Sequence, residues 1–300
     1  MNTSTTLRLG ATLLSVSLLA ACGSGTDGDV SVQSSAAGKN ESATLFASLP
    51  ADIQKAGTIQ VGSDLAYAPM EYLDDSGNAV GFDVELADLL EPQLGVEFVW
   101  NNAQFDGLIT QLKSGRIDVA ISGMSDTAER QKEIDFVDYY NAGGVLLVKK
   151  GNPAGLQSAA DLCGKTLAVQ RGTTAEEVSG AQSTACEADG KEPLEVLAFD
   201  RETEAMLQVK NGRADSGMQD YPIAAYNART SGGGNDFEIV GDQIEAGPLG
   251  IGVSKEDTAL RDSLQQALQG VMDSGDYQKL IDAYEVPLGA IDKATVNGGQ

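Results

Sequence analysis

The pattern of apolar and polar positions divides most of the chain into short strands and helices. Ile117, Val119 and Ile121 alternate with other residues, which is typical of a strand with one buried face. Leucines spaced three or four apart indicate helices at residues 83–90, which Asp83 is expected to cap, and at 260–271. The alternation of strands and helices along the chain predicts an α/β fold. Further strands are expected at residues 58–62, 96–100, 165–170, 194–198 and 237–240, and further helices at 106–114, 202–210 and 276–284.

A six-residue motif occurs twice. Residues 113–118, KSGRID, recur as residues 210–215, KNGRAD, and each copy follows a helical stretch and leads into a short strand. Both strands end in polar residues, at 122–130 in the first copy and 219–221 in the second. The repeat predicts two similar α/β lobes, each presenting a loop at the carboxyl end of a strand, where open α/β sheets bind ligands. The alternative interpretation is a chance repeat.

Arg130 follows the first of these strands. Asp126 and Glu129 have the spacing of a capping box, which predicts a helix with Arg130 in its first turn. The helix dipole disfavours a cation there, whereas a guanidinium holds a carboxylate with two parallel hydrogen bonds. Arg130 is therefore either an exposed surface residue or the ligand of an anion, supported by the backbone N–H groups of residues 123–125. Asp220 of the second lobe would then hold the ammonium group of the same zwitterion.

Other candidate side chains lie near predicted strand ends. Asp64 and Tyr67 follow the first strand, on the expected ligand face. Phe105 precedes a helix, where it either packs in the core or stacks on a ligand. Thr173 or Thr174 caps a further helix that begins at a strand end, and an ordinary capped helix without a ligand is the alternative.

Composition narrows the possible functions. The 300 residues suffice for two domains of ordinary size. A net charge of −24 and a pI near 4.1 argue against a nucleic-acid-binding protein, which needs a basic surface. The chain has no histidine, so imidazole is lost both as a general base and as a metal ligand. We expect no metal ion and no cofactor.

The N-terminal residues 1–21 have the pattern of an export signal. Arg8 precedes an apolar run at residues 9–21 that is too short to span a bilayer comfortably. Residues 19–22, LAAC, resemble the bacterial lipobox, which predicts cleavage before Cys22 and attachment of lipid to its sulfur. The alternative is a secreted protein with a stray cysteine.

Two segments outside the predicted core are expected to lack fixed structure. Residues 22–48 are rich in Gly, Ser, Ala, Asp and Thr, and we expect them to form a flexible tether. Residues 291–300 end in Asn, Gly and Gln, and we expect a disordered tail.

The other two cysteines, Cys163 and Cys186, lie within the second predicted lobe. Export makes an oxidising compartment the expected environment, so we predict a disulfide between them. It would stabilise the fold by about 3 kcal/mol on the loop-entropy model. Two free thiols are the alternative.

Several motifs carry a resemblance to a known family. They are GFDVELA at 81–87, FDGLI at 105–109, SGRID at 114–118, the loop 123–130, IDF at 134–136, QRGTT at 170–174 and YPIAAY at 221–226. From about residue 57 to 284 the chain resembles the family 3 extracellular solute-binding proteins, which feed amino-acid ABC importers. The resemblance implies a two-lobed, type II periplasmic-binding-protein-like fold, in which each lobe is a mixed sheet flanked by helices and two crossing strands join the lobes. The implied boundaries are 49–140 and 249–290 for lobe 1, 145–244 for lobe 2, and 141–144 and 245–248 for the hinge.

The resemblance also implies how the α-groups of an amino acid are held. Arg130 would bind the α-carboxylate, helped by Ser125 and the Gly123 backbone. Thr174, at the start of its helix, would add a hydrogen bond to the same carboxylate. Asp220 would bind the α-ammonium group.

Further residues would contact the ligand side chain. Tyr67 and Phe105 would pack on it, and Asp64 would touch its polar end and favour a basic or amide group. Arg171 and Gln219 would flank the pocket, and Arg171 would favour an acidic ligand if it points inward. The predicted ligand-binding residues are Asp64, Tyr67, Phe105, Ser122, Gly123, Ser125, Arg130, Arg171, Thr174, Gln219 and Asp220.

The function implied is that of a lipid-anchored substrate-binding protein without enzymatic activity, which captures a polar amino acid and delivers it to the permease of an ABC importer. We expect a monomer held by acylated Cys22 at the outer face of the cell membrane, with no nucleic-acid partner. One alternative is an enzyme on the same scaffold, similar to the cyclohexadienyl dehydratases. Another is a ligand sensor for a membrane signalling partner.

Overall fold

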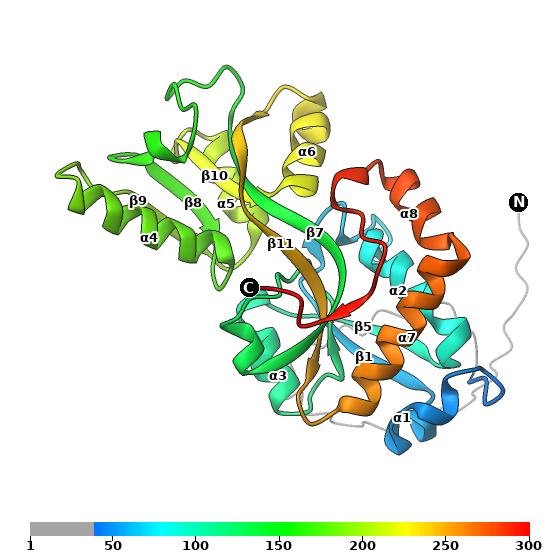
Figure 1. Ribbon diagram of the computed structural model, residues 1–300. Coiled ribbons are helices and arrows are strands. Elements are labelled where there is room, and N and C mark those ends of the chain that lie inside the picture. Colours follow the sequence, from blue (N-terminus) through cyan, green and yellow to red (C-terminus); the bar gives the residue numbers. More distant parts are fainter. Residues whose placement is uncertain (1–38) are drawn as a thin grey trace, which may run out of the picture.

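The computed structural model describes residues 39–300, which form two lobes joined by two long strands (Figure 1). Mixed sheets flanked by helices build both lobes, and this confirms the predicted fold class. The predicted export signal and lipidated Cys22 lie outside the described residues. Among residues 39–300, no helix is both long and apolar enough to cross a membrane.

Lobe 1 is built around strand β1 (Thr58–Ser63), which pairs in parallel with β5 (Glu97–Asn102) and β6 (Val119–Ala120). Because the three strands are parallel, their carboxyl ends meet at one edge of the sheet. The remaining elements of this lobe are α1 (Ala51–Ala56), the antiparallel strands β2 (Ala66–Tyr67), β3 (Glu71–Leu73) and β4 (Ala79–Val80), and the helices α2 (Phe82–Leu94), α3 (Leu108–Lys113), α7 (Thr258–Ser274) and α8 (Asp276–Tyr284).

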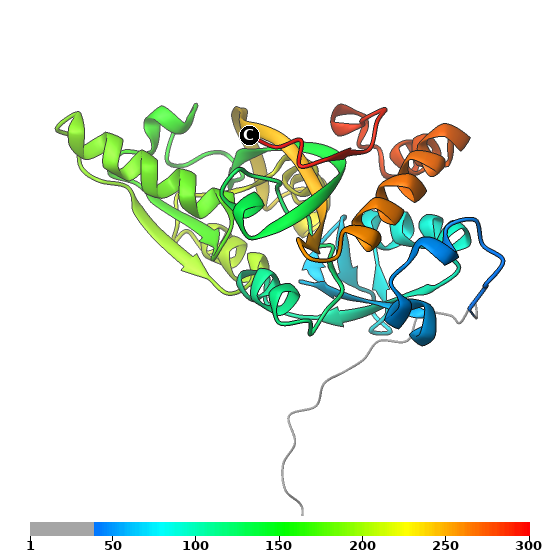
Figure 2. The same cartoon turned by 60° about the horizontal axis from the view of Figure 1, so that its bottom comes forward.

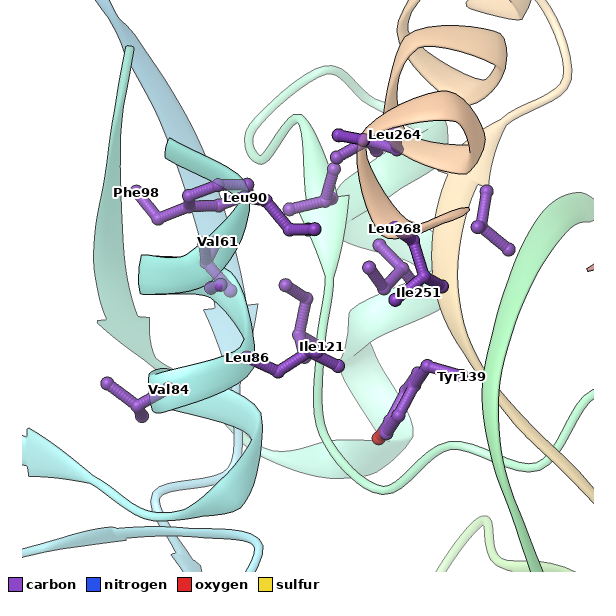
Figure 3. Close-up of a cluster of buried hydrophobic side chains, with 14 of the residues drawn as sticks. Val61, Val84, Leu86, Leu90, Phe98, Ile121, Tyr139, Ile251, Leu264 and Leu268 are labelled. Carbon is purple, nitrogen blue, oxygen red and sulfur yellow. The ribbon is translucent and has the colours of Figure 1, made fainter. Parts of the chain in front are cut away.

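The main core of lobe 1 lies between the sheet and helices α2 and α7 (Figure 3). Leu86 and Leu90 of α2 are one turn apart and share a buried face, as their spacing predicts. Leu264 and Leu268 of α7 and Ile251 of the sheet belong to the same buried cluster. Burying one leucine side chain fully stabilises the folded state by about 1.5–3 kcal/mol, so this layer of side chains holds the sheet of lobe 1 firmly in place.

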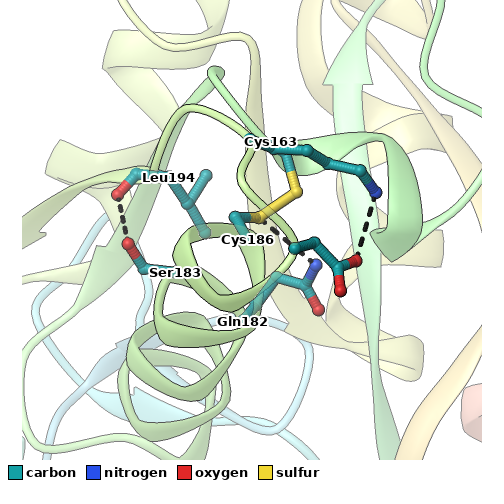
Figure 4. Close-up of a disulfide and its surroundings, with 7 residues drawn as sticks. Cys163, Gln182, Ser183, Cys186 and Leu194 are labelled. Atoms are coloured by element: carbon teal, nitrogen blue, oxygen red, sulfur yellow. Dashed lines mark hydrogen bonds and ion pairs between the residues drawn. A yellow bond between two sulfur atoms is a disulfide. The ribbon is translucent and has the colours of Figure 1, made fainter.

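Lobe 2 repeats the plan on a smaller scale. Strand β8 (Thr166–Gln170) pairs in parallel with β9 (Glu195–Phe199) and β10 (Ser216–Asp220). A disulfide between Cys163 and Cys186 joins the segment before β8 to helix α4, which confirms the predicted pair (Figure 4). The helices are α4 (Thr174–Ala188), α5 (Glu202–Lys210) and α6 (Tyr221–Thr230).

Strands β7 (Ile134–Lys149) and β11 (Phe237–Ser254) run antiparallel through both lobes. Their register shifts on both sides of Ile244, where they pass from one lobe to the other. Figure 2 shows the two strands curving past each other between the lobes. These irregular positions overlap the segments 141–144 and 245–248, whose role as a hinge stays a prediction.

The repeated motif has the same structural role in both lobes. The Asp118 N–H donates to the Gln60 carbonyl across 2.8 Å, and the Asp118 carboxylate accepts from the Gln60 N–H at 2.7 Å. Asp215 makes the same two bonds with the backbone of Thr166, at 2.8 and 2.9 Å. Each aspartate therefore fastens the loop before β6 or β10 to the neighbouring strand, β1 or β8. The two copies are equivalent parts of two similar lobes and no coincidence.

The expectation of a flexible tether at residues 22–48 is wrong for residues 39–48. Phe46 is buried in the core of lobe 1, and the Asn40 N–H donates to the Gly95 carbonyl across 2.9 Å. The predicted range included this bulky aromatic residue, which brings enough apolar surface to fix the segment.

Short 3₁₀ helices lie at Phe46–Ser48, Phe105–Gly107, Arg130–Lys132, Ala159–Leu162, Ser231–Gly233 and Pro287–Gly289.

The expectation of a disordered tail at residues 291–300 is also wrong. Thr295–Val296 forms strand β12, which pairs antiparallel with β7. The red C-terminal segment in Figure 1 therefore crosses the long strands and ends between the lobes. Composition gave no sign of this order, because the segment is fixed by backbone pairing with a strand remote in sequence.

Candidate functional site

A cavity of about 790 Å³ lies between the lobes, at the carboxyl ends of β1, β6, β8 and β10. The two lobes therefore bring equivalent strand ends to one site, as the repeat predicts. Every predicted ligand-binding residue except Arg171 lines this cavity: Asp64, Tyr67, Phe105, Ser122, Gly123, Ser125, Arg130, Thr174, Gln219 and Asp220.

Arg130 is the cation of the site and is only 7% exposed. Its Nη1 donates to the Ser125 carbonyl across 2.8 Å, and its Nη2 donates to the Gly172 carbonyl of lobe 2 across 2.9 Å. The guanidinium carbon lies 5.4 Å from the centre of the Phe105 ring, within the range of a cation–π contact. Burial lowers the pKa of Arg130, but an arginine remains charged at neutral pH. The guanidinium is thus held in place at the lobe interface.

The predicted α-helix around Arg130 is not present, because the chain forms only a short 3₁₀ turn at Arg130–Lys132. Asp126 does not act as a helix cap. Its carboxylate accepts instead from the Gln131 side chain and from the Gly299 N–H, both at 2.8 Å. Thr127 Oγ1 accepts from the Arg130 N–H at 3.3 Å. The spacing of Asp126 and Glu129 suggested a capping box, but the Asp126 carboxylate binds the C-terminal segment instead.

Asp220 is the opposite charge on the other side of the cavity. It is the last residue of β10, and its carboxylate accepts from the Tyr67 hydroxyl of lobe 1 across 2.9 Å. Burial raises the pKa of Asp220 to about 6, although the Tyr67 hydrogen bond and the Arg130 charge oppose the shift. A cationic ligand group beside this carboxylate would favour its ionised form.

The loop after β6 donates hydrogen bonds to the carboxyl groups of two buried acids. Ser122 Oγ donates to Glu71 Oε1 across 2.9 Å, and the Gly123 N–H donates to Asp83 Oδ2 across 3.2 Å. This N–H therefore has a protein partner, contrary to its predicted role at the anion. Gly123 has φ 50°, and a Cβ there would lie 3.0 Å from the Tyr67 ring, so the loop needs glycine at this position.

Glu71 and Asp83 are two acids buried beneath the same loop. Within residues 39–300, Glu71 Oε2 and Asp83 Oδ1 have no hydrogen-bond partner. Burial raises the pKa of both groups, to well above the usual range for Glu71 and to about 6 for Asp83. The negative charge of Asp83 raises the pKa of Glu71 further. Asp83 accepts from the Tyr139 hydroxyl at 2.9 Å and caps no helix, contrary to the prediction.

Helix α4 begins at the cavity. Thr173 is its N-cap, and its hydroxyl accepts from the Glu176 N–H at 3.3 Å, which confirms one of the two predicted caps. Thr174, the first helical residue, lines the cavity. The start of this helix presents a partial positive charge, which suits an anionic group of a ligand.

Asp64 joins the lobes in this conformation. Its carboxylate accepts from Gln170 Nε2 across 2.6 Å and forms an ion pair with Arg201, both from lobe 2. Arg171 is exposed and pairs instead with Asp200, so its predicted role at the pocket is wrong. Neighbouring residues of an extended chain point to opposite sides, and the residue that reaches the cavity is Gln170.

Gln219 and Glu202 form a buried pair at the lobe 2 side of the cavity. Gln219 Nε2 donates to Glu202 Oε1 across 2.7 Å, and burial raises the pKa of Glu202 to about 8. Both residues also line a second cavity of about 240 Å³. The sequence did not identify Glu202 as a site residue, because an acid in the first turn of a helix is common without any ligand.

Acidic side chains outnumber basic ones around the main cavity. Arg130 is the single basic residue that lines it in the described part of the chain. The acidic residues in its lining are Asp64, Glu71, Asp126, Glu202, Asp220 and Glu245.

A protein-family model and a curated relative match most of this chain. The model of the bacterial extracellular solute-binding proteins, family 3, matches residues 59–286. The arginine-binding protein ArgT of Corynebacterium glutamicum is 31% identical over 256 residues, which cover 84% of this chain and 82% of that protein.

Two solved structures are similar at comparable identity. A mutant of the arginine-binding protein ArgBP from T. maritima has a TM-score of 0.70 at 36% identity, covering 78% of this chain and 97% of that chain. The ancestral amino acid-binding protein AncCDT-1, a precursor of cyclohexadienyl dehydratase, has a TM-score of 0.70 at 34% identity, with the same coverage of 78% and 97%.

Proposed function

The chain belongs to family 3 of the bacterial extracellular solute-binding proteins, and we propose that it captures a free amino acid with a basic side chain for an ABC importer. The observation that carries the proposal is the placement of Arg130 and Asp220, which have opposite charges, lie on opposite lobes and line one cavity. A zwitterion between them would have both charges compensated in a buried site, where an unpaired charge is costly. Because the two partners lie on different lobes, binding would favour closure.

The residues around this pair have roles that follow from their chemistry. The Arg130 guanidinium would take the α-carboxylate, together with Ser125 and the start of α4 at Thr174. Asp220 would take the α-ammonium group. Phe105 would pack on the aliphatic part of the ligand, and its contact with Arg130 keeps both side chains in position.

The excess of acidic side chains supports a basic ligand. A third charged group on the ligand would lie among Asp64, Glu202 and Gln219, and Arg201 already pairs with Asp64. A cation there would relieve repulsion between buried acids, whereas a carboxylate would add to it. The names of similar proteins, such as the arginine-binding protein of C. glutamicum, agree with this assignment.

Anchoring and delivery complete the proposal. The sequence at residues 19–22 supports a lipid on Cys22, which would hold the protein at the outer face of the cell membrane beside its permease. The relatives carry names of binding proteins, which supports a role in capture and not in catalysis. AncCDT-1 is likewise described as an amino acid-binding protein.

Thermal unfolding of the purified protein with each of the twenty common amino acids tests the proposal. We expect L-arginine or L-lysine to raise the midpoint most, because a ligand at one hundred times its Kd stabilises the folded state by about 2.7 kcal/mol. L-glutamate serves as the matched control of similar length and opposite charge. Stabilisation by glutamate but not by arginine would contradict the basic ligand, and no response to any amino acid would contradict the function.

A further inference from the structure

The C-terminal residues 295–300 reach the proposed ligand cavity although they lie outside the family match, which ends at residue 286. Gly298 and Gln300 both contribute to the lining of the cavity. The segment crosses strand β7 from the lobe 1 side and ends between the lobes (Figure 2). This chain therefore carries a cavity wall that the matched family region does not supply.

Side-chain and backbone bonds fix the first part of this segment on β7. Thr295 and Val296 pair with Asp138 and Val137 of that strand. Asn297 Oδ1 accepts from the Phe136 N–H across 2.8 Å. The segment thus adds a short strand to β7, and the Asn297 side chain adds a polar bond to the same strand.

The next two residues bind a pair of carboxylates. The Gly298 N–H donates to Asp138 Oδ2 across 2.9 Å, and the Gly299 N–H donates to Asp126 Oδ2 across 2.8 Å. Thr295 Oγ1 adds a third bond, to Asp138 Oδ2, at 2.6 Å. The backbone N–H groups of the tail therefore stabilise two neighbouring acids that would otherwise repel each other.

The same contacts hold the segment that carries Arg130 at both its ends. Asp126 lies four residues before the arginine, and Gln131, directly after it, donates from Nε2 to the Gly299 carbonyl across 3.0 Å. Gln131 Nε2 also donates to Asp126 Oδ1 at 2.8 Å, which closes a small ring of bonds. On the other side, the Asp126 N–H donates to the Pro248 carbonyl of β11 across 2.8 Å.

The contact at Gly299 leaves no room for a side chain. A Cβ at this position would lie 1.9 Å from the Asp126 carbonyl oxygen, so the backbone of the tail rests directly on the backbone of the loop. Even alanine would have to push the tail away from Asp126. Such an approach between two backbones is a specific fit and not a loose end of the chain.

We propose that residues 295–300 form a strap that positions the Ser125–Arg130 segment and walls one side of the amino-acid cavity. The strap acts through Asp126 and Gln131, so its residues are positioning residues for Arg130. This inference rests on the proposed function, because it assigns the strap to the same ligand site. Removing the strap should leave the fold in place and weaken ligand binding.

Two variants of the full-length protein test the strap. One deletes residues 295–300 and keeps Ala294, which is 1% exposed and belongs to the lobe 1 core. The other is Gly299→Ala, with Lys293→Ala as a control at an exposed position just before the segment. Calorimetric titration with L-arginine gives Kd, thermal unfolding without ligand gives stability, and hydrogen exchange of the ligand-free protein reports on residues 122–131.

We expect both strap variants to bind L-arginine at least about tenfold more weakly and to exchange faster at residues 122–131, whereas Lys293→Ala matches the wild type. Binding within about twofold of the wild type in both folded variants would overturn the strap. Unchanged exchange at residues 122–131 would overturn it too, and this readout needs no ligand. Failure of the wild type itself to bind any amino acid would instead refute the proposed function, and the exchange measurement would still judge the strap.

Discussion

The Tyr67 hydroxyl of lobe 1 donates to the Asp220 carboxylate of lobe 2 across 2.9 Å, and the Tyr67 hydroxyl oxygen accepts from the Asp220 N–H at 3.3 Å. This reciprocal contact requires the two lobes to lie close together. It also orients the carboxylate that we assign to the ligand ammonium group. In the proposed binding mode, the charge state of Asp220 would therefore link closure of the lobes to ligand binding.

Ligand affinity should fall at acidic pH because of Asp220. Burial raises the pKa of this carboxyl to about 6, so it is protonated below that pH and cannot pair with an ammonium group. Binding would favour the ionised form and release the proton. Affinity should therefore rise with pH up to about 6 and fall by up to roughly tenfold per pH unit below it. Titration calorimetry with L-arginine between pH 7.5 and 5 measures the effect.

The Asp220→Asn variant provides the control for this pH profile. It should bind weakly at all pH values and lose the part of the profile that Asp220 contributes, so that the remaining slope reports other acids such as Glu202 and Asp64. A wild-type Kd that stays constant from pH 7.5 to 5 would contradict the assignment of Asp220.

The raised pKa of Glu71 favours its protonated form and predicts an asymmetric response to substitution at this position. Glu71→Gln should be tolerated, since the amide can donate to Asp83 and accept from the Ser122 hydroxyl. Glu71→Leu removes the acceptor of the buried Ser122 hydroxyl and should lower the free energy of unfolding by about 1–3 kcal/mol more. Urea unfolding of the two variants decides the matter, and equal destabilisation would argue against a protonated Glu71.

The disulfide between Cys163 and Cys186 should matter for stability more than for binding. The bond lies near the end of α4 that is remote from Thr174, whereas the start of the helix lines the cavity. Replacing both cysteines with serine should lower the free energy of unfolding by about 3 kcal/mol on the loop-entropy model. The folded variant should keep its Kd for L-arginine. An unfolding curve that reducing agent leaves unchanged in the wild type would count against this role.

The proposed lipid attachment at Cys22 predicts where the protein is found in cells. The wild type should sediment with membranes, and Cys22→Ala should appear in the soluble exported fraction, because the proposed site of lipid attachment is lost. Membrane fractionation followed by immunoblotting makes the comparison. A Cys22→Ala protein that stays with washed membranes would place the anchor elsewhere.

Local patterns were enough to predict much of the fold and the site. The helix cap at Thr173, the disulfide partners and the strand ends that carry Asp64 and Asp220 all depend on residues near in sequence or on a repeated motif. The repeat was informative because Asp118 and its counterpart in lobe 2 make the same backbone bonds.

Other features depend on contacts between distant residues, which no local pattern contains. Asp83 has the position of a helix cap but is buried against Tyr139, which follows it by more than fifty residues. Arg171 and Gln170 differ by one position, and a shift of one residue in an extended segment decides which side chain reaches the cavity. The order of residues 295–300 depends on β7, so their glycine-rich composition misled the prediction.

Calorimetric titration of L-arginine into the wild type, Arg130→Ala and Arg116→Ala tests the central claim most directly. Arg116 is an exposed arginine of the same lobe, so its variant controls for the loss of one positive charge. Arg130→Ala should lose about 2–5 kcal/mol of binding free energy, roughly thirtyfold or more in Kd, because the ligand carboxylate would be buried without its partner. Arg116→Ala should bind like the wild type. An Arg130→Ala protein that binds L-arginine within about threefold of the wild type would contradict the account.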